Sequence, residues 1–584
     1  MASLNPSDEE LSAQASERAA VGRRLVESDA HLRVVVAGPG TGKTFCFRGA
    51  LEKAGGGLAL TFINNLADMM RADLADVADV YTCHGYAKRL LYEMGAPGFP
   101  DAPDYYPPLF ELLAADINLS HSSRISSRDL GLHFARVERG DPVIRDALAL
   151  GAHYRAVTHD DCVLRVTEYL LSHPEATPTV PLLVVDEFQD FNRSEARFLW
   201  LLGMANKVLL AGDDDQALYT FKGASSRFLR LIHARNDSEC HSLPYCSRSP
   251  RAVTDAVDLV VQMAHAEGKL DGRLPKRFEC YLPDKLADSR DYPRLRHVAC
   301  TVENNRSPYI GLAVDALIDR IPRADWDDAR NGGYPCVLVV GPVEFVKRTH
   351  ATLVERGRVA GLKRSTPPEV LLYHGYSRLA SDSASRLGWR IVVHCRPPEE
   401  WATAVATALD DDCCLADVLP MEYVSRHLEV ADALASAVMG QPVADILVAR
   451  VPEIAGLPLA DLLAQADDAP DCAGDSSDAL CAGGILCTSL AGCKGLSASH
   501  VFLVGMNDGH FPHRRASITD DEICQLIVAL SRTRKSCTLV STGRFGRQTP
   551  ATSVFVDWLS PLVEGYKYSR NGLEALPLST GLGP

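Results

Sequence analysis

The stretch that decides the fold is the run Arg33-Val34-Val35-Val36, followed directly by Ala37-Gly38-Pro39-Gly40-Thr41-Gly42-Lys43-Thr44. The β-branched run predicts a buried strand, and the glycines let the next backbone segment close around a phosphate with its N–H groups pointing inward. Lys43 would place a positive charge on the β- and γ-phosphates, and the Thr44 hydroxyl would ligate Mg²⁺. The order strand, loop, helix therefore predicts a nucleoside triphosphate site. A glycine-rich turn that binds nothing is the less favoured interpretation.

A second apolar run, Leu182–Val185, ends in Asp186-Glu187-Phe188-Gln189-Asp190. The carboxyl end of a buried strand is where ligands of open α/β sheets collect. Asp186 is the candidate Mg²⁺ ligand, and Glu187 is the candidate base that takes a proton from an attacking water. Two acids after an apolar run could also simply end a strand, but together with the glycine-rich loop they indicate the second half of the same site.

A third strand edge carries Asp213–Gln216, followed by Tyr219 and Phe221. Gln216 could hydrogen-bond a γ-phosphate, and the two aromatic rings could serve as stacking surfaces for nucleic-acid bases. Ordinary core packing is the commoner fate of such rings and stays open as the alternative.

Short apolar runs alternate with longer amphipathic stretches, which is typical of an α/β fold with parallel sheets. The runs expected as strands are Arg33–Ala37, Leu58–Phe62, Leu182–Val185, Lys207–Ala211, Cys336–Val340, Glu369–Tyr373, Ile485–Ser489, Val501–Val504 and Cys537–Ser541. They form two sets, which predicts two core domains, each interrupted by a helical insertion of roughly 90 residues. The expected parts are a first core at 1–87 and 181–243, its insertion at 88–180, a second core at 244–396 and 485–565, its reduced insertion at 397–484, and a tail at 566–584.

Composition limits the class of protein. A chain of 584 residues exceeds what one hydrophobic core usually supports, and 46% hydrophobic with 23% charged residues excludes a largely disordered chain. The formal net charge of −15 argues against binding polyanions by bulk charge but permits a basic groove. The chain has no basic-then-apolar start and no apolar run of ~20 residues, so a cytoplasmic protein without a membrane partner is expected.

Seventeen cysteines are expected to be buried apolar residues, not disulfides. The spacing of Cys472, Cys481, Cys487 and Cys493 is too loose for a usual zinc site, so no metal cluster is expected there.

The motifs occur in an order that resembles the UvrD/Rep-type superfamily 1 helicases over most of the chain. After Ala37–Thr44 come Leu60–Asn64, Thr82–Gly85, Val185–Asp190, Gly212–Tyr219, Arg248–Pro250, Lys494–Leu496 with Val501–Met506, and Val528–Arg534. The resemblance implies two RecA-like cores with ATP and Mg²⁺ in the cleft between them and single-stranded DNA, or a single-strand/duplex junction, across their top. It also implies an ATP-dependent 3′–5′ DNA helicase that acts in repair or recombination.

The resemblance assigns roles to further residues. Arg248 and Arg532 would reach the γ-phosphate as arginine fingers, each of which can be worth ~10³–10⁵ in rate. Gly495 would lie at the nucleotide. The DNA contacts implied by the family pattern are Phe62, Asn64, His84, Tyr219, Phe221 and Ser489.

Several positions depart from the family pattern. The motif that usually reads His-Ser-Ala-Lys-Gly-Leu-Glu is Ala491–Ser497 here, so its His and Glu are missing, and Phe221 stands where the family has a tryptophan. The adenine-stacking tyrosine is out of register, with Tyr245 as a possible substitute, and Gln14 is the candidate adenine-reading glutamine.

These departures leave a second interpretation open. It is a DNA-sensing ATPase subunit of a repair or phage-defence complex, with a nuclease or another subunit as its partner, that does not unwind alone. A P-loop ATPase or kinase unrelated to nucleic acid is a third and less favoured interpretation. A fused nuclease is not expected, because only about 50 residues follow the last motif.

Overall fold

The computed structural model describes residues 6–121, 124–137, 140–301, 309–362, 368–438 and 482–576. Its first half is built on a six-stranded sheet with the order β3-β2-β6-β7-β1-β8, in which all neighbouring strands run parallel. The strands are β1 (Leu32–Ala37), β2 (Gly57–Thr61), β3 (Ala78–Thr82), β6 (Leu183–Val185), β7 (Val208–Gly212) and β8 (Ser238–Leu243).

Helices cover both faces of this sheet, which explains why β1 is apolar without alternation. Val34 and Val36 lie in one cluster, which includes residues of α4 (Cys83–Glu93), α8 (His159–Ser172) and α9 (Arg193–Ala205). Val35 and Ala37 point to the other face, toward α1 (Asp8–Glu27), α2 (Lys43–Ala54) and α3 (Asn64–Leu74). A short helix, α10 (Arg227–His233), precedes β8.

The second half contains an eight-stranded sheet with the order β13-β14-β12-β15-β16-β11-β17-β18, which is parallel except for its last pair. Its strands are β11 (Leu295–Cys300), β12 (Val337–Gly341), β13 (Ala360–Leu362), β14 (Ile485–Ser489), β15 (Ala498–Val504), β16 (Thr533–Thr542), β17 (Val563–Ser569) and β18 (Gly572–Ala575). The helices of this half are α11 (Arg251–Ala266), α12 (Leu282–Asp291), α13 (Tyr309–Ile318), α14 (Arg323–Asn331), α15 (Val343–Glu355), α24 (Asp520–Leu530) and α25 (Val554–Leu559). Between β8 and this sheet, β9 (Tyr245–Cys246) pairs with β10 (Glu279–Cys280).

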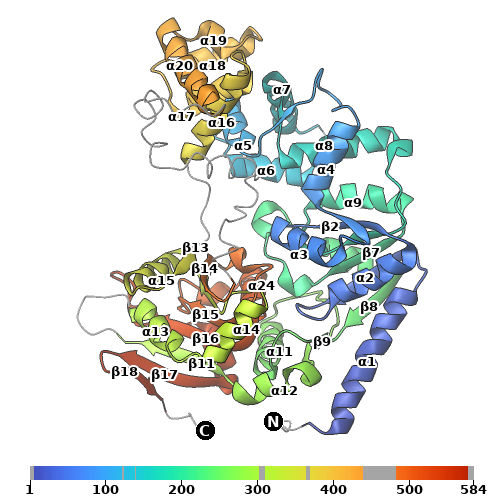
Figure 1. The fold of residues 1–584 in the computed structure, drawn as a ribbon, viewed down its shortest axis with the longest axis vertical. Helices are drawn as coiled ribbons and strands as arrows, with labels where there is room; N and C mark the ends of the chain where they lie inside the picture. The colour runs from blue at the N-terminus through green and yellow to red at the C-terminus, as the bar shows by residue number, and fades with distance from the viewer. Residues whose placement is uncertain are drawn as a thin grey trace.

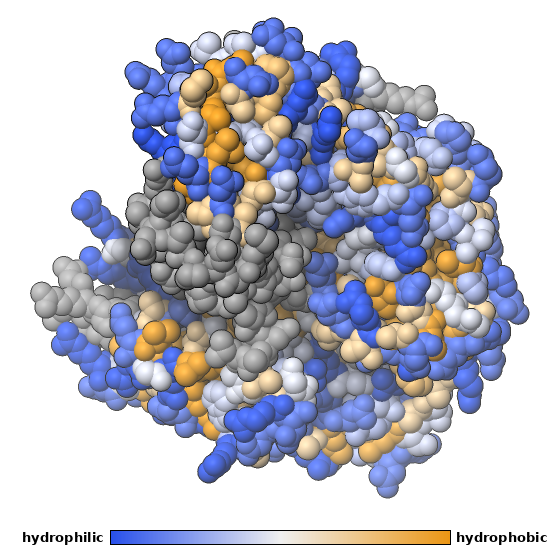
Figure 2. Space-filling view, turned by 45° about the horizontal axis from the view of Figure 1, so that its top comes forward, coloured by the Kyte–Doolittle hydropathy of each residue, from blue (hydrophilic) through white to orange (hydrophobic). Residues whose placement is uncertain are grey.

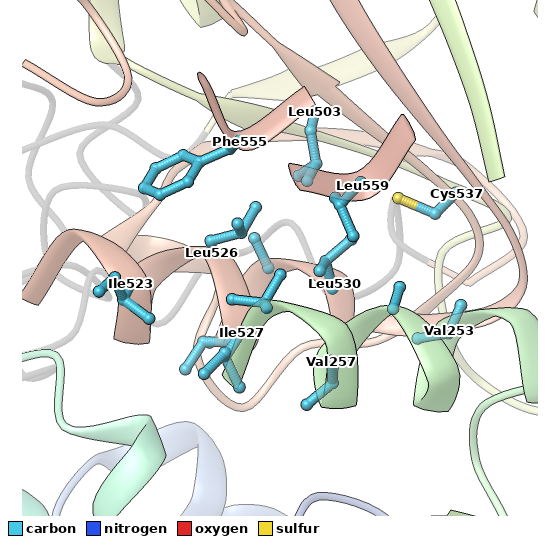
Figure 3. Packing of buried hydrophobic residues seen from close by; sticks show 14 of the residues in the cluster. Val253, Val257, Leu503, Ile523, Leu526, Ile527, Leu530, Cys537, Phe555 and Leu559 are labelled. Carbon is cyan, nitrogen blue, oxygen red and sulfur yellow. The ribbon is translucent and has the colours of Figure 1, made fainter. Parts of the chain in front are cut away.

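The main core of the second half lies where α24 packs against α11 (Figure 3). Leu526, Ile527 and Leu530 of α24 are buried beside Val253 and Val257 of α11. This packing fixes the carboxyl end of α24, and therefore the residues Ser531 and Arg532 that follow it.

The helices inserted in the two halves form one body rather than two (Figure 1). It contains α5 (Leu109–His121), α6 (Ser127–Arg136), α7 (Pro142–Tyr154), α16 (Pro368–Ser381), α17 (Arg386–Cys395), α18 (Trp401–Asp410), α19 (Leu415–Val418) and α20 (Met421–Val438). Leu387 and Ile391 of α17 share a buried cluster with α5, α6 and α7. A two-stranded sheet of β4 (Asp104–Tyr105) and β5 (Ala156–Val157) joins the same region.

A buried ion pair crosses this body. The Arg390 guanidinium of α17 donates two hydrogen bonds to one oxygen of Asp116 on α5, at 3.0 and 2.7 Å, and both side chains are fully buried. Tyr154 of α7 donates its hydroxyl to the other Asp116 oxygen at 2.8 Å.

The side chains on one face of the molecule are mainly hydrophilic, with a band of hydrophobic residues over the helical body near the top of the view (Figure 2).

The α/β class with parallel sheets is confirmed, and eight of the nine expected strand runs overlap a strand of either sheet. Glu369–Tyr373 was expected to be a strand, and this prediction is wrong, because the run lies in α16. Its buried residues Leu372, Tyr376 and Leu379 are spaced by four and three positions, which is the spacing of one helix face. The helical part of the second half therefore starts at Pro368, before the expected boundary at 397.

The expected tail at 566–584 also needs correction for its described part. Tyr566 and Lys567 are in β17, which pairs with β11, and β18 continues the same sheet. Cys472 and Cys481 lie outside the described residues. The cysteines in the described ranges form no disulfide, and most of them are buried. Among the described helices, none has the length and hydrophobicity that crossing a bilayer requires.

Candidate active site

Three neighbouring strands bring the predicted nucleotide-site residues to one edge of the first sheet. The glycine-rich loop follows β1, Asp186 and Glu187 follow β6, and Gln216 lies in a 3₁₀ turn, η3 (Asp214–Gln216), after β7. Since β7 pairs with both β1 and β6 and all three run parallel, their carboxyl ends meet.

The glycine-rich loop is shaped by two residues with positive φ. Gly40 has a φ of 70° and Gly42 a φ of 93°, both in the left-handed region that favours glycine. A Cβ at Gly40 would lie 2.4 Å from the Cβ of Arg248, so a side chain there would collide with the segment that carries this arginine. Gly42 precedes the first turn of α2, which begins at Lys43 and contains Thr44. The loop therefore has the open backbone and helix N-terminus that a phosphate requires.

Lys43 lies against both acids. Its Nζ is 2.9 Å from Oε1 of Glu187 and 3.3 Å from Oδ1 of Asp186. Burial alone would lower the pKa of Lys43, but the two carboxylates together raise it. Lys43 is therefore charged at neutral pH.

Glu187 is held in an unusual backbone conformation, with a φ of 55°. For a residue with a side chain, this conformation costs about 1–2 kcal/mol and is typical of functional positions. Its Oε1 contacts Lys43, and its Oε2 accepts a hydrogen bond from Gln189 Nε2 at 2.6 Å and lies 3.4 Å from Lys494 Nζ. Although burial works in the opposite direction, the two lysines lower the pKa of Glu187, so its carboxylate is ionised at neutral pH.

Lys494 comes from the second half and enters the first. Its side chain is 3% exposed, pairs with the Asp190 carboxylate and donates a hydrogen bond to the Gln216 carbonyl oxygen at 2.9 Å. Asp190 has no solvent exposure, and burial raises its pKa to about 6 in spite of the adjacent Lys494. One lysine thus ties the loop after β14 to the loops after β6 and β7.

The two predicted arginine fingers lie close to each other. Arg532 Nη2 donates to the side-chain oxygen of Gln216 at 3.1 Å, which joins the segment after α24 to the edge of the first sheet. Arg248 lies beside Arg532, and burial followed by this neighbouring charge lowers the pKa of Arg248 to about 9. Its Nη1 is buried and has no hydrogen-bond partner among the described residues.

This donor set fits a nucleoside triphosphate with Mg²⁺. A buried guanidinium nitrogen without an acceptor, next to a second arginine and to the glycine-rich loop, is the arrangement that an anionic phosphate would complete. Thr44 and Asp186 are the residues that would hold the cation, because they supply the hard oxygen ligands that Mg²⁺ prefers. Gly495, with a φ of 81°, packs toward Ile63 and Leu66 of the first half and so lets Lys494 approach.

The candidate base-binding residues are engaged with the protein itself. Gln14 of α1 donates to the Cys280 carbonyl at 3.5 Å and accepts from the Leu282 N–H at 3.1 Å. Tyr245 is 4% exposed and donates its hydroxyl to Glu17. Beside α1, the half-buried ring of Tyr281 is covered by the guanidinium of Arg18, which lies 4.3 Å from the ring centre.

The predicted DNA-contact residues differ in exposure. Phe62 is 9% exposed, with the Tyr219 ring 4.8 Å and the Phe191 ring 5.6 Å away, so it is packed in the core. Phe221 is 41% exposed and stands 6.0 Å from Tyr219, with Arg128 near its face. Of the phenylalanine and tyrosine side chains among the six, Phe221 is the most exposed.

The remaining three predicted DNA contacts are polar. Asn64 begins α3 and is half-buried, and Ser489 ends β14, where its hydroxyl accepts from the Gly492 N–H at 3.1 Å. His84 lies 3.0 Å from Glu195 and 3.8 Å from Asp160. Burial alone would lower the pKa of His84, but the two acids raise it to about 10.

Some residues of the site have no role in the interpretation of the sequence. Lys494 and Gln189 stand inside motifs but were assigned no contact. The signals for them were local, since both follow buried strands as the assigned residues do. Lys276, which binds the acids after β7, gives no local signal.

Comparisons with known proteins agree with the motif series. The family model described as "UvrD/REP helicase N-terminal domain" matches residues 149–235, which include β6, β7 and their loops. A "Probable DNA helicase" of Mycoplasma pneumoniae is 24% identical over 299 residues, which is 42% of this chain and 56% of that protein. The mitochondrial ATP-dependent DNA helicase HMI1 of Saccharomyces cerevisiae is 22% identical over 276 residues, which is 40% of this chain and 39% of that protein.

The chain thus spans about half the length of the curated relatives that it matches. The family match falls on the part of the first sheet that carries the candidate site residues Asp186, Glu187 and Gln216. Residues 149–235 are thus similar to the N-terminal domain of UvrD/REP helicases, and two DNA helicases resemble the chain at low identity, in agreement with its motif series.

Proposed function

We propose that this chain is a DNA-stimulated ATPase that moves 3′–5′ along single-stranded DNA and opens duplex ahead of it, in DNA repair or recombination. The observation that carries the proposal is that Lys494 and Arg532 of the second half contact the residues around Glu187 and Gln216 of the first. A change in the charge at Glu187 or at the bound phosphate would therefore act on both halves at once.

The residues divide the work by position. Lys43 and the loop N–H groups bind the phosphates, and Arg248 and Arg532 stabilise the charge that develops as the terminal phosphoryl group leaves. A bound Mg²⁺ would neutralise charge on the β- and γ-phosphates from its place at Thr44 and Asp186. Glu187, which is ionised, accepts the proton of the attacking water at one of its carboxylate oxygens.

Both oxygens of Glu187 are already paired, one with Lys43 and the other with Gln189 and Lys494. Glu187 can orient a water only after one of these partners moves, and phosphates bound by Lys43 would draw that lysine away. We propose that DNA binding moves Lys494 in the same way, because its loop begins at Ser489, a predicted DNA contact.

The test is ATP hydrolysis by the purified chain with and without single-stranded DNA. We expect stimulation by DNA in the wild type and its loss in Lys43→Ala and Glu187→Gln, with Arg235→Gln, an exposed change after α10, as the matched control. Directional strand displacement on tailed DNA and RNA duplexes then measures polarity and substrate. Absence of stimulation by any single strand would refute the motor.

A second function is favoured by one specific feature. The family pattern has a glutamate where this chain has Ser497, whose hydroxyl accepts a hydrogen bond from Arg534 at 3.0 Å. Without this glutamate the link between DNA contact and nucleotide is altered, so the chain could serve as a DNA-sensing ATPase subunit that needs a nuclease or another subunit to unwind. Stimulated ATPase without strand displacement, and unwinding only on addition of a partner, would support this alternative.

A further inference from the structure

Lys276 is a buried lysine outside the predicted motifs, and it lies among three carboxylates. Its side chain is 4% exposed, and its Nζ lies 2.5 Å from Asp213, 2.5 Å from Asp214 and 3.0 Å from Asp215. Asp213 precedes the turn η3 after β7, and Asp214 and Asp215 begin it. The side chains of the three acids are 0–4% exposed. An ammonium group at the centre of the acids takes the place that a metal ion would need.

The other two cations of the cluster pair with Asp214 and Asp215, so Lys276 is the cation that pairs with Asp213. Arg230 pairs with Asp214 at 2.9 Å, and Arg273 pairs with Asp215 at 2.8 Å. Within the described part of the chain, Asp213 forms its ion pair with Lys276 and with no other cation. Burial of Asp213 would raise its pKa, but Lys276 lowers it, which keeps this carboxylate charged.

Asp213 in turn fixes the orientation of the Gln216 amide. Its Oδ2 accepts a hydrogen bond from Gln216 Nε2 at 2.5 Å. An ionised carboxylate only accepts, so the NH₂ group of Gln216 must face it, and the amide oxygen is left to accept from Arg532 Nη2 at 3.1 Å. If the Gln216 amide were flipped, its oxygen would face the Asp213 carboxylate oxygen and its NH₂ group would face the Arg532 guanidinium. Neither pair could form a hydrogen bond.

The same residue orients a second glutamine. The backbone N–H of Asp213 donates to Gln189 Oε1 at 2.9 Å, which leaves Gln189 Nε2 to donate to Glu187 at 2.6 Å. Asp213 therefore orients both amides. It directs the Gln216 amide toward the arginine finger Arg532 and the Gln189 amide toward the base Glu187.

We propose that Lys276 is a positioning residue for ATP hydrolysis: by holding Asp213 in place, it makes Gln216 present its amide oxygen to Arg532 and Gln189 its NH₂ group to Glu187. This inference rests on the proposed ATPase function of the site. The segment that carries Lys276 is well placed for this role, since the Leu274 N–H also donates to Asp214, at 2.9 Å.

The kinetic test uses Lys276→Met, which keeps length and removes charge, with Arg273→Met as the matched control that breaks the pair with Asp215 alone. We expect Lys276→Met to lower kcat for DNA-stimulated ATP hydrolysis at least tenfold, with the Kd for ATP within about threefold of the wild type, because the glycine-rich loop is untouched. Arg273→Met should change kcat less than threefold at a similar loss of stability. Equal losses of kcat in both variants would overturn the proposal.

A triple variant, compared with its double-variant background, separates positioning from general packing. If Lys276 acts through the two amides, then Lys276→Met should lower kcat by less than threefold further in a Gln216→Ala, Gln189→Ala background. A full additional tenfold loss there would contradict the proposal. Should Lys276→Met not fold, Asp213→Asn replaces it in the same cycle, because a carboxamide no longer dictates the amide direction.

A crystal structure of the same variant gives a readout that does not depend on activity. The proposal predicts that Gln216 Oε1 and Arg532 Nη2 are separated by more than 4 Å in Lys276→Met, or in Asp213→Asn, and an unchanged contact refutes it. If the wild-type chain shows no ATPase, the proposed function fails by itself, and the structure still decides whether Lys276 positions Gln216.

Discussion

Replacing Lys494 by methionine tests whether the two halves are held together through the acids of the first sheet. The Nζ group contacts Asp190 and lies 3.4 Å from Glu187 Oε2, and the lysine side chain is only 3% exposed. Removing one partner of a buried ion pair leaves an uncompensated charge, which costs about 3–5 kcal/mol. Glu187 keeps Lys43 as a partner, so most of this cost should come from Asp190.

The assay is urea unfolding followed by circular dichroism, for the wild type, Lys494→Met, Asp190→Asn and the double variant. We expect Lys494→Met to lose about 3–5 kcal/mol of unfolding free energy, and Asp190→Asn to lose less, because Lys494 keeps Glu187 as a partner. The double variant should lose at least about 2 kcal/mol less than the sum of the two, because no unpaired charge remains at Asp190. Strict additivity, or a single variant as stable as the wild type, would refute the idea that this ion pair joins the halves.

Three further predictions concern other parts of the molecule. Because the pKa of His84 is raised to about 10, its ion pairs with Glu195 and Asp160 stabilise the fold fully below pH ~6.5 and lose this effect as the pH rises through 10. The difference in unfolding free energy between the wild type and His84→Gln should therefore shrink between pH 6 and 10. A difference that stays constant over this range would contradict the pairing. Phe221→Ala should weaken binding of single-stranded DNA by about 1–3 kcal/mol in a fluorescence anisotropy titration, whereas Phe62→Ala should chiefly lower stability. The reverse pattern would mean that the bases stack on Phe62 and not on Phe221. Arg390→Met should cost about 3–5 kcal/mol in unfolding free energy and Arg390→Met with Asp116→Asn clearly less than the sum, and no measurable cost of the single change would mean that the two groups of inserted helices are not held by this pair.

The loops of the candidate site could be predicted from the sequence because each one follows a buried strand of β-branched or leucine residues. Val34–Val36, Leu183–Val185 and Leu209–Ala211 mark their strands, and the polar residues that come next must then lie at the carboxyl edge of a parallel sheet. The order of β6, β7 and β1 in the sheet was not predictable, yet it is what brings Lys43, Glu187 and Gln216 together.

The parts that sequence did not indicate share a physical cause. Glu369–Tyr373 is too short a run to separate a strand from a helix, and the spacing that decides it lies further on, at Tyr376 and Leu379. The strand β8 is partly exposed at the sheet edge and so lacks an apolar run. Lys276 contacts acids about 60 residues earlier in the chain, and an ion pair between distant segments leaves no local pattern.

That the two sets of inserted helices pack into one body could also not be predicted from the sequence. Leu387 and Ile391 look like ordinary helix residues, and only the fold places them against α5, α6 and α7. The length of each insertion predicts two separate accessory domains, because each is long enough to form its own core. The Arg390–Asp116 pair, which connects residues 274 positions apart, shows instead that the two insertions fold together.

The central claim is that one triphosphate is bound by residues of both halves. It is tested most directly by a crystal structure of the chain with Mg²⁺ and a non-hydrolysable ATP analogue, in which the distances from Arg248 and Arg532 to the terminal phosphate are measured. We expect guanidinium nitrogens of both residues within about 3.2 Å of its oxygens, with Lys43 moved from Glu187 onto the phosphates. A terminal phosphate bound by Lys43 alone, with both arginines beyond the reach of a hydrogen bond, would contradict the account.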